Sequence, residues 1–167
     1  PMANYIGWMA EQLDGKSPEF EAELTHQIRQ AMAERFLQGL DAFPGALELL
    51  TRLHLPFCVA TNGPREKVEM TLGLAGLRHL FGNRIFSAYE VGCFKPDPGL
   101  FIHAAEVLGV EPCRCAVVED SLPGIKAGLA AGMKVFALHP RETTSPELAA
   151  HIYFIDSLSE FDRLLHM

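Results

Sequence analysis

The sequence predicts an α/β fold built on a doubly wound parallel sheet. Short apolar runs that do not alternate with polar residues, such as 57–60 and 115–118, are typical of strands buried on both faces. Segments with helical periodicity separate these runs, which produces the repeated strand–helix–strand order of parallel sheets. Polar residues follow the apolar runs directly, at the strand ends where open α/β sheets bind their ligands.

Composition and charge restrict the possible classes of function. The chain has 167 residues, 49% hydrophobic and 21% charged, which is ordinary for one globular domain with or without a small appendage. Its net charge is −7 and its basic residues are scattered, so we expect no nucleic-acid partner. Lys134 interrupts the best apolar stretch, so we expect no membrane partner. The four cysteines lack metal-ligand spacing and favour reduced thiols in the cytoplasm.

Residues 1–40 are predicted to be helical and to differ from the rest of the chain. Trp8 and Leu13 can share the apolar face of a first helix. Ser17 and Pro18 suit the N-cap and first position of a second helix, whose apolar residues repeat every four positions as far as residue 36. We expect 1–40 to be part of a helical subdomain, joined by a hinge to a core at 41–167.

Strands and helices alternate along this predicted core. The expected strands are 57–60, 85–89, 115–118, 135–138 and 152–155. Helices are expected between them, including 64–74, one begun by Asp97 and Pro98, and a last one at 158–165. This order is the basis for the doubly wound arrangement.

Two adjacent carboxylates, Glu119 and Asp120, end the apolar run 115–118. No Lys or Arg is next to them in sequence, so a cation or a proton must relieve their repulsion, and Mg²⁺ is the simplest candidate. The alternative is that they are solvated turn residues or helix caps, as acids after a strand often are. The glycines at 124, 128 and 132 favour close packing of a helix on the sheet over phosphate binding.

Three further polar residues follow earlier strands. Thr61 offers a hydroxyl, Asn62 opens a helix N-terminus suited to anions, and Lys95 offers a positive charge. A hydroxyl, an ammonium group and Mg²⁺ together can stabilise the oxygens of a phosphoryl group. Taken singly, Thr61 could simply cap its helix and Lys95 could be a solvated surface residue. Their order on successive strand–helix units is what favours the phosphoryl site.

The segments V-A-T-N-G-P, F-K-P-D-P and V-V-E-D-S-L-P-G-I-K-A-G resemble motifs II, III and IV of the haloacid dehalogenase superfamily. The resemblance covers about 40–165 and is closest to the phosphatase and β-phosphoglucomutase-like branch with a helical cap. It implies that Thr61 and Asn62 contact phosphate and that Lys95 neutralises it. It also implies that Asp120 binds Mg²⁺ directly and Glu119 directly or through water. Residues 1–40 would then be the last helices of the cap.

The first motif of that superfamily, D-x-D-G-T, is absent from this sequence. The aspartates are at 14, 41, 97, 120, 156 and 162, and none fits the motif; we interpret Asp156 as structural. Covalent phosphoryl transfer has no first step without the nucleophilic Asp. We therefore expect a core that lacks its first strand and exposes sheet edges, whether by fragmentation, an incorrect gene start or true loss. The opening Pro1 favours a fragment or a cleaved product.

The leading hypothesis is an Mg²⁺-dependent phosphatase acting on a small phosphorylated metabolite, with a sugar phosphate as the expected substrate. A β-phosphoglucomutase-like phosphomutase and a non-catalytic phosphate- and Mg²⁺-binding module are the alternatives. A metal-independent dehalogenase is less favoured, because it has no use for the carboxylate pair. A response-regulator receiver domain is excluded by the order of residues: in receivers the acids precede the Thr and Lys, whereas here Thr61 and Lys95 precede Glu119 and Asp120. The complete protein is expected to be a monomer, whereas this chain could form dimers through an exposed sheet edge.

Overall fold

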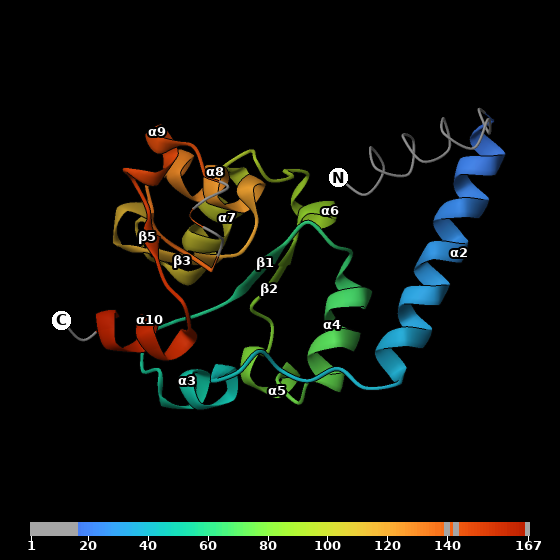
Figure 1. Ribbon diagram of the computed structural model, residues 1–167, viewed down its shortest axis with the longest axis horizontal. Helices are drawn as coiled ribbons and strands as arrows, with labels where there is room; N and C mark the ends of the chain where they lie inside the picture. Colours follow the sequence, from blue (N-terminus) through green and yellow to red (C-terminus); the bar gives the residue numbers. More distant parts are fainter. Residues whose placement is uncertain (1–16, 139–140, 142–143, 166–167) are drawn as a thin grey trace. The chain divides into compact units, whose positions relative to one another are not determined.

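The computed structural model describes residues 17–138, 141 and 144–165 (Figure 1). The chain divides into two compact units, 1–41 and 42–167, and each is described by itself. Within the described part, no helix has the length and apolarity needed to cross a membrane. The predicted helix containing Trp8 and Leu13 lies outside the described residues.

The described part of the first unit contains α2 (Pro18–Leu37). Ser17 is its N-cap: the Ser17 side chain accepts a hydrogen bond from the Phe20 backbone N–H, and Pro18 occupies the first turn. Glu19 and Glu21 in the first turn and Arg35 in the last are placed favourably for the helix dipole. The predicted start of this helix is confirmed.

The second unit holds all the described strands, in two parallel sheets. β1 (Val59–Thr61) pairs with β2 (Ile85–Ser87), and Thr61 is in register with Ser87. In the other sheet β4 (Lys134–Ala137) lies between β3 (Ala116–Glu119) and β5 (Tyr153–Phe154). Every pairing is parallel, so the predicted α/β class with parallel strands is confirmed, although β1 and β3 are edge strands of separate sheets.

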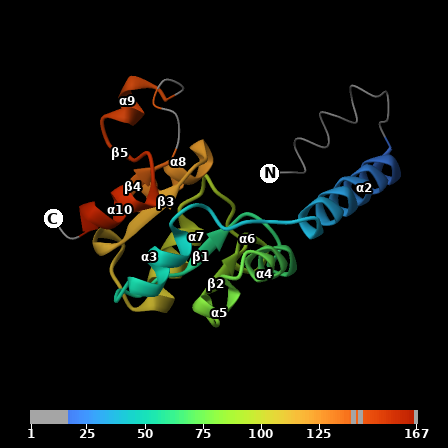
Figure 2. The ribbon, with the colours of Figure 1, turned by 60° about the horizontal axis from the view of Figure 1, so that its bottom comes forward.

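Helices connect and cover these strands (Figures 1 and 2). In chain order they are α3 (Ala46–Arg52), α4 (Arg65–Leu74), α5 (Arg78–Phe81), α6 (Ala88–Val91), α7 (Gly99–Leu108), the 3-10 helix η1 (Pro112–Arg114), α8 (Leu122–Ala130), α9 (Pro146–Ala149) and α10 (Leu158–Leu165). α7 contacts both strands of the first sheet and also α8, which packs on β3 and β4. One helix therefore contributes to the packing of both sheets.

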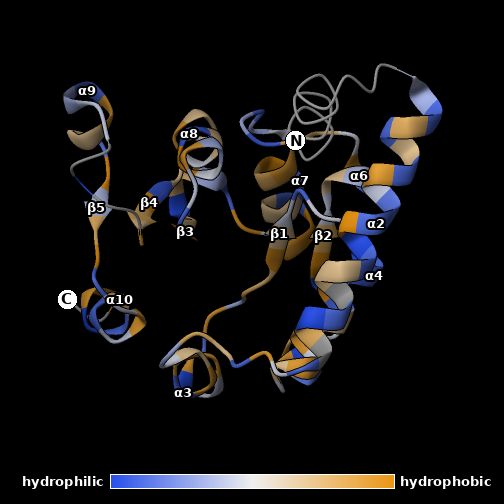
Figure 3. Cartoon of the chain, turned by 45° about the vertical axis from the view of Figure 1, so that its right-hand side comes forward, coloured by the Kyte–Doolittle hydropathy of each residue, from blue (hydrophilic) through white to orange (hydrophobic). Residues whose placement is uncertain are grey.

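Successive strand residues belong to cores on opposite faces, as expected of a doubly wound fold. In β4, Val135 packs with residues of α7 and α8, whereas Phe136 packs with α3 and α10. In β2, Ile85 packs with α3, α4 and α5, and Phe86 packs with α7. Figure 3 shows β1 and β2 as hydrophobic along their lengths, which matches burial on both faces.

The second predicted strand, 85–89, is too long. Ser87 ends β2 because its hydroxyl accepts a hydrogen bond from the Tyr89 backbone N–H and caps the short helix α6. The same hydroxyl donates to the Gly63 carbonyl, 2.8 Å away, in the loop after β1. A side chain that caps a helix and ties two loops together therefore decides where this strand stops.

Candidate functional site

The candidate site is organised around an ion pair between Lys95 and Glu119. The Lys95 ammonium donates to Oε1 of Glu119, which is the last residue of β3. Both side chains are nearly buried, with exposed fractions of 10% and 8%. The ammonium also lies 4.9 Å from the centre of the Phe101 ring, which gives the cation a second favourable contact.

Asn62 fixes the backbone that carries Lys95. Its Nδ2 donates to the Lys95 carbonyl over 3.1 Å, and its Oδ1 accepts from the Lys95 backbone N–H over 2.9 Å. These paired hydrogen bonds join the loop after β1 to the loop before α7, 33 residues further along the chain. The Lys95–Pro96 peptide bond in this loop is cis. Asn62 thus positions the lysine that reaches Glu119.

Thr61 ends β1 and forms a tight turn with the residues that follow it. Its Oγ1 accepts a hydrogen bond from the Gly63 backbone N–H at 3.0 Å. An accepting hydroxyl keeps its own proton for donation, so Thr61 can also donate to an anionic oxygen. The helix that follows, α4, begins at Arg65, and no side chain caps its N-terminus. Its first N–H groups need acceptors, which suits this end of the strand to an anion.

The Glu119 carboxylate is held on both of its oxygens. Its Oε2 accepts from the Ser121 hydroxyl at 2.8 Å and from the Ser121 backbone N–H at 3.4 Å. Ser121 is also the N-cap of α8, because its Oγ accepts from the Gly124 N–H over 3.2 Å. Three hydrogen-bond donors, from Lys95 and Ser121, therefore bind the Glu119 carboxylate. The cation next to Glu119 is Lys95, whereas the sequence predicted Mg²⁺.

Asp120, by contrast, is exposed and faces a hollow at the carboxyl ends of the second sheet. The hollow has a volume of about 500 Å³ and is lined by Phe43, Val118, Glu119, Asp120, Leu138, Ile155 and Asp156. Asp156, interpreted from sequence as structural, also lines this hollow, and its backbone N–H donates to Oε2 of Glu160 at 2.8 Å. The accessible carboxylate of the pair is Asp120.

The carboxylates fit a hard, oxygen-seeking cation such as Mg²⁺ only in part. Mg²⁺ takes six oxygen ligands and keeps several waters, so one or two carboxylates with substrate phosphate suffice. In the part of the chain that the structure describes, no group of three His, Cys, Asp or Glu side chains forms a metal cluster. Asp120 is exposed and lines the hollow, while Lys95 and Ser121 bind the oxygens of Glu119.

Arg65, at the start of α4, binds a different carboxylate, that of Glu90. Its guanidinium binds both carboxylate oxygens of Glu90, at 2.5 and 2.6 Å, and donates to the Ile85 carbonyl at 2.6 Å. The hydrogen bond to Glu90 raises the pKa of Arg65, and the same hydrogen bond lowers the pKa of Glu90. The Arg65 side chain therefore ties α4 to α6 and β2.

The three predicted residues Asn62, Lys95 and Glu119 form one connected group in the structure. Thr61 precedes Asn62 and Asp120 follows Glu119, so all five lie at the carboxyl ends of β1 and β3 or on the loop bound to them. Sequence reasoning missed Ser121 and Gly124 as parts of this site. The Ser-x-x-Gly spacing predicts the N-cap, but nothing in the sequence shows that Ser121 also binds the carboxylate.

The three glycines of the α8 region have three different surroundings, and the prediction of close packing on the sheet holds for Gly124 and Gly128 but not for Gly132. At Gly128 an added Cβ would lie 2.8 Å from Cγ2 of Val135, so this glycine does allow the helix to approach β4. Gly132 has φ +73° with open space around it, and it ends the helix. At Gly124 an added Cβ would meet the Glu119 carboxylate.

The structure is that of an α/β protein with polar side chains gathered at the carboxyl ends of parallel strands, where open α/β sheets bind their ligands. The sequence profile of the family described as "haloacid dehalogenase-like hydrolase" matches residues 2–132. The chain belongs to this family of hydrolases, which confirms the resemblance drawn from the three motifs.

Several curated relatives of the chain are phosphatases. It is 35% identical over 139 residues to a 6-phosphogluconate phosphatase of Escherichia coli, a match covering 77% of this chain and 63% of the relative. It is 33% identical over 134 residues to hexitol phosphatase A of the same bacterium, covering 77% of this chain and 55% of the relative. The chain therefore spans less than two thirds of the length of either relative.

A solved structure supports the same fold. The chain aligns with a HAD family hydrolase from Deinococcus radiodurans at a TM-score of 0.72 and 32% identity. The alignment covers 96% of this chain and 73% of that one, and that crystal contains bound phosphate and sodium.

Proposed function

We propose that the protein to which this chain belongs is an Mg²⁺-dependent phosphoric monoester hydrolase acting on a small phosphorylated metabolite, a sugar phosphate in particular. The observation that carries the proposal is the buried Lys95, which Asn62 holds at the carboxyl end of β3 beside Glu119. A fixed ammonium beside carboxylates at strand ends is suited to an anionic substrate and its counter-cation. The names of the two bacterial relatives support the sugar phosphate class.

The proposed division of labour follows from the contacts of each side chain. Thr61 donates its hydroxyl proton to a phosphoryl oxygen, since its lone pair already accepts from Gly63. Lys95 places positive charge next to that oxygen. Asp120 provides a carboxylate ligand for Mg²⁺, and Glu119 binds it directly or through water. When bound there, Mg²⁺ supplies further charge neutralisation on the transferring phosphoryl group.

Asn62 is proposed to bind the phosphate with its backbone N–H and not with its side chain. Its side-chain amide is engaged on both sides by the backbone of Lys95, at 3.1 and 2.9 Å. The backbone N–H of Asn62 can contact the anion while the side chain keeps Lys95 in place. This role extends the predicted phosphate contact at Asn62.

We propose that 1–40 is the remaining part of a helical cap and 41–167 the catalytic core. The division of the chain into compact units after Asp41 supports this boundary. The parallel edges of β1 and β3 suit a further parallel strand between them, and we propose that such a strand, absent from this sequence, brings the nucleophilic Asp. The substrate-selecting part of the cap would lie with it.

The test is phosphate release by the protein as its native cell makes it, preceded by measurement of its intact mass. A mass well above that of these 167 residues, with D-x-D-G-T in an N-terminal peptide, fits the proposal. Sugar and polyol phosphates should then be hydrolysed only with Mg²⁺ present, and Asp120→Asn should abolish turnover. Asp97→Asn serves as the matched control, because Asp97 is also an exposed aspartate but does not line the hollow. Its Oδ1 accepts a hydrogen bond from the Gly99 backbone N–H, which an asparagine can also accept. Mg²⁺-independent release, or equal loss in both variants, would contradict the proposal.

A binding module without turnover is the alternative when no nucleophile is present. This chain would then bind Mg²⁺ and the phosphate analogue tungstate, and hydrolyse nothing. Its binding of tungstate, measured by calorimetry, should weaken in Lys95→Ala. Equal affinity in that variant would remove Lys95 from the anion site.

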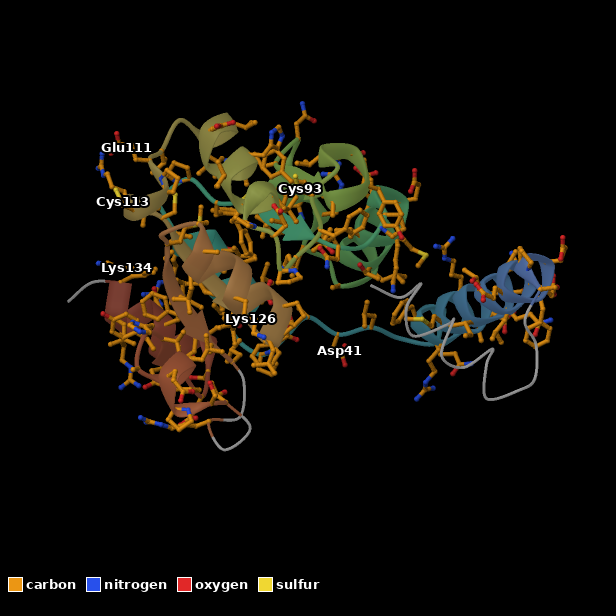
Figure 4. All side chains as sticks on the ribbon, turned by 90° about the horizontal axis from the view of Figure 1, so that it is seen from above. Asp41, Cys93, Glu111, Cys113, Lys126 and Lys134 are labelled. Carbon is orange, nitrogen blue, oxygen red and sulfur yellow. The ribbon has the colours of Figure 1, made fainter. Side chains whose placement is uncertain are left out.

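The proposed compartment is the cytoplasm, and the thiols support it. Cys58, Cys93, Cys113 and Cys115 are all free. Burial, with a smaller effect from Cys115, raises the pKa of Cys58 to about 11, so this thiol stays protonated at neutral pH. Cys113 is exposed beside Glu111 at η1, well apart from Cys93 (Figure 4). Exposed free thiols persist in reducing surroundings.

A further inference from the structure

Gly124 lies in the first turn of α8, where its own backbone does not require a glycine. It is buried, and its φ is outside the left-handed region that favours glycine. Glycine is among the least favourable residues inside a helix, because it has the most backbone freedom to lose. The reason for a glycine at this position must therefore come from its surroundings.

Those surroundings are the carboxylate of Glu119. A Cβ built on Gly124 would lie 2.0 Å from Cδ of Glu119, and 2.1 and 2.2 Å from its two oxygens. These separations are far inside van der Waals contact, so any side chain at 124 would require the carboxylate to move. Gly73, in the last turn of α4, has nothing within 4 Å of the corresponding position.

The carboxylate has little freedom to move away. Its Oε1 accepts from the Lys95 ammonium, and its Oε2 accepts from the Ser121 hydroxyl and backbone N–H. Glu119 is also only 8% exposed, so a displaced carboxylate would lose these donors without gaining water in their place. Displacement would break the ion pair with Lys95 and move the Glu119 carboxylate out of its position next to Asp120.

We propose that Gly124 is a positioning residue: by lacking a Cβ, it reserves the space in which the Glu119 carboxylate meets Lys95 and Ser121. Gly128, one turn later, fills a packing role against Val135, so the two glycines of α8 serve different purposes. The proposal rests on the proposed function only where it concerns Mg²⁺. Its effect on the ion pair is independent of catalysis.

The test compares Gly124→Ala with the control Gly73→Ala in this chain. Alanine is the better helix former at both sites, so Gly73→Ala should keep or raise the melting temperature. Gly124→Ala should lower the melting temperature and weaken Mg²⁺ binding, titrated as the chloride by calorimetry, by about tenfold or more. Unchanged melting and unchanged Mg²⁺ affinity in Gly124→Ala would overturn the proposal.

A second background separates the clash with the carboxylate from a general intolerance of alanine. Lys95→Met with Glu119→Ala removes the whole ion pair, so no buried charge is left behind. In that background Gly124→Ala should no longer lower the melting temperature. An equal decrease in both backgrounds would refute the proposal. If the unaltered chain binds no Mg²⁺, the metal site of the proposed function fails, and this comparison of melting temperatures still decides the role of Gly124.

Discussion

Two ion pairs of the second unit link segments of similar separation but differ in burial. Lys95 and Glu119 are 24 residues apart and their side chains are 10% and 8% exposed. Arg65 and Glu90 are 25 residues apart and 31% and 46% exposed. The geometry of the exposed pair is good, with two hydrogen bonds, so the difference between the pairs lies in access to water.

Access to water decides what each charge needs from its partner. Water can solvate Arg65 or Glu90 if the other is lost, and it screens their attraction while they are paired. Lys95 and Glu119 have given up most of their hydration, so each depends on the other and on Asn62, Ser121 and Phe101. The stability of the chain is therefore expected to be sensitive to single substitutions in the buried pair. This pair, and not the exposed one, belongs to the candidate site at the strand ends.

The largest expected effect comes from breaking the buried pair on one side. Lys95→Met should destabilise the chain by about 3 kcal/mol, because it leaves the Glu119 carboxylate buried without its cation. Urea unfolding followed by circular dichroism measures this. Arg65→Met is the matched control and should change stability much less. Equal losses in the two variants would show that burial does not distinguish the pairs.

A smaller effect is expected from loosening the support of Lys95. Asn62→Ala removes two hydrogen bonds to the Lys95 backbone, and should destabilise the chain by about 1–2 kcal/mol and weaken tungstate binding. Unfolding and calorimetry provide the two measurements. Asn83→Ala, at an exposed asparagine, is the control and should change neither quantity. Tungstate binding that survives Asn62→Ala intact would mean that Lys95 needs no such support.

The smallest effect is expected from the exposed pair, and it should depend on pH. The hydrogen bond from Arg65 lowers the pKa of Glu90 below its ordinary 4.5, so the folded chain takes up this proton at lower pH than the unfolded chain does. The stability it contributes is present at neutral pH and is lost as the pH falls below 4.5 through the lowered pKa.

Glu90→Gln should therefore lower the melting temperature at pH 7 by no more than about 3 °C, and the difference from the unaltered chain should shrink at acid pH. Thermal unfolding at several pH values measures this. A difference that grows toward acid pH would have the wrong sign for the assigned pair.

Local sequence signals predicted several elements closely. Ser17 and Pro18 marked the start of α2, and the last helix occupies 158–165 as expected. The predicted strand at 85–89 was wrong beyond Ser87, because that side chain caps α6 instead of continuing the strand. A serine can either continue a strand or cap a helix, and one partner of Ser87, the Gly63 carbonyl, lies in another loop.

The sequence by itself determined the alternation of strands and helices, the three motifs and the family, because these depend on residues that are neighbours along the chain. Only the tertiary structure decided that Lys95 neutralises Glu119, that Asn62 holds Lys95, and that Gly124 leaves room for the carboxylate. The first two contacts join residues 24 and 33 positions apart, and the third depends on how α8 turns back over the end of β3. The repulsion expected between Glu119 and Asp120 is relieved at Glu119 by a lysine that local sequence cannot reveal, since the packing of α7 and the loops brings it there.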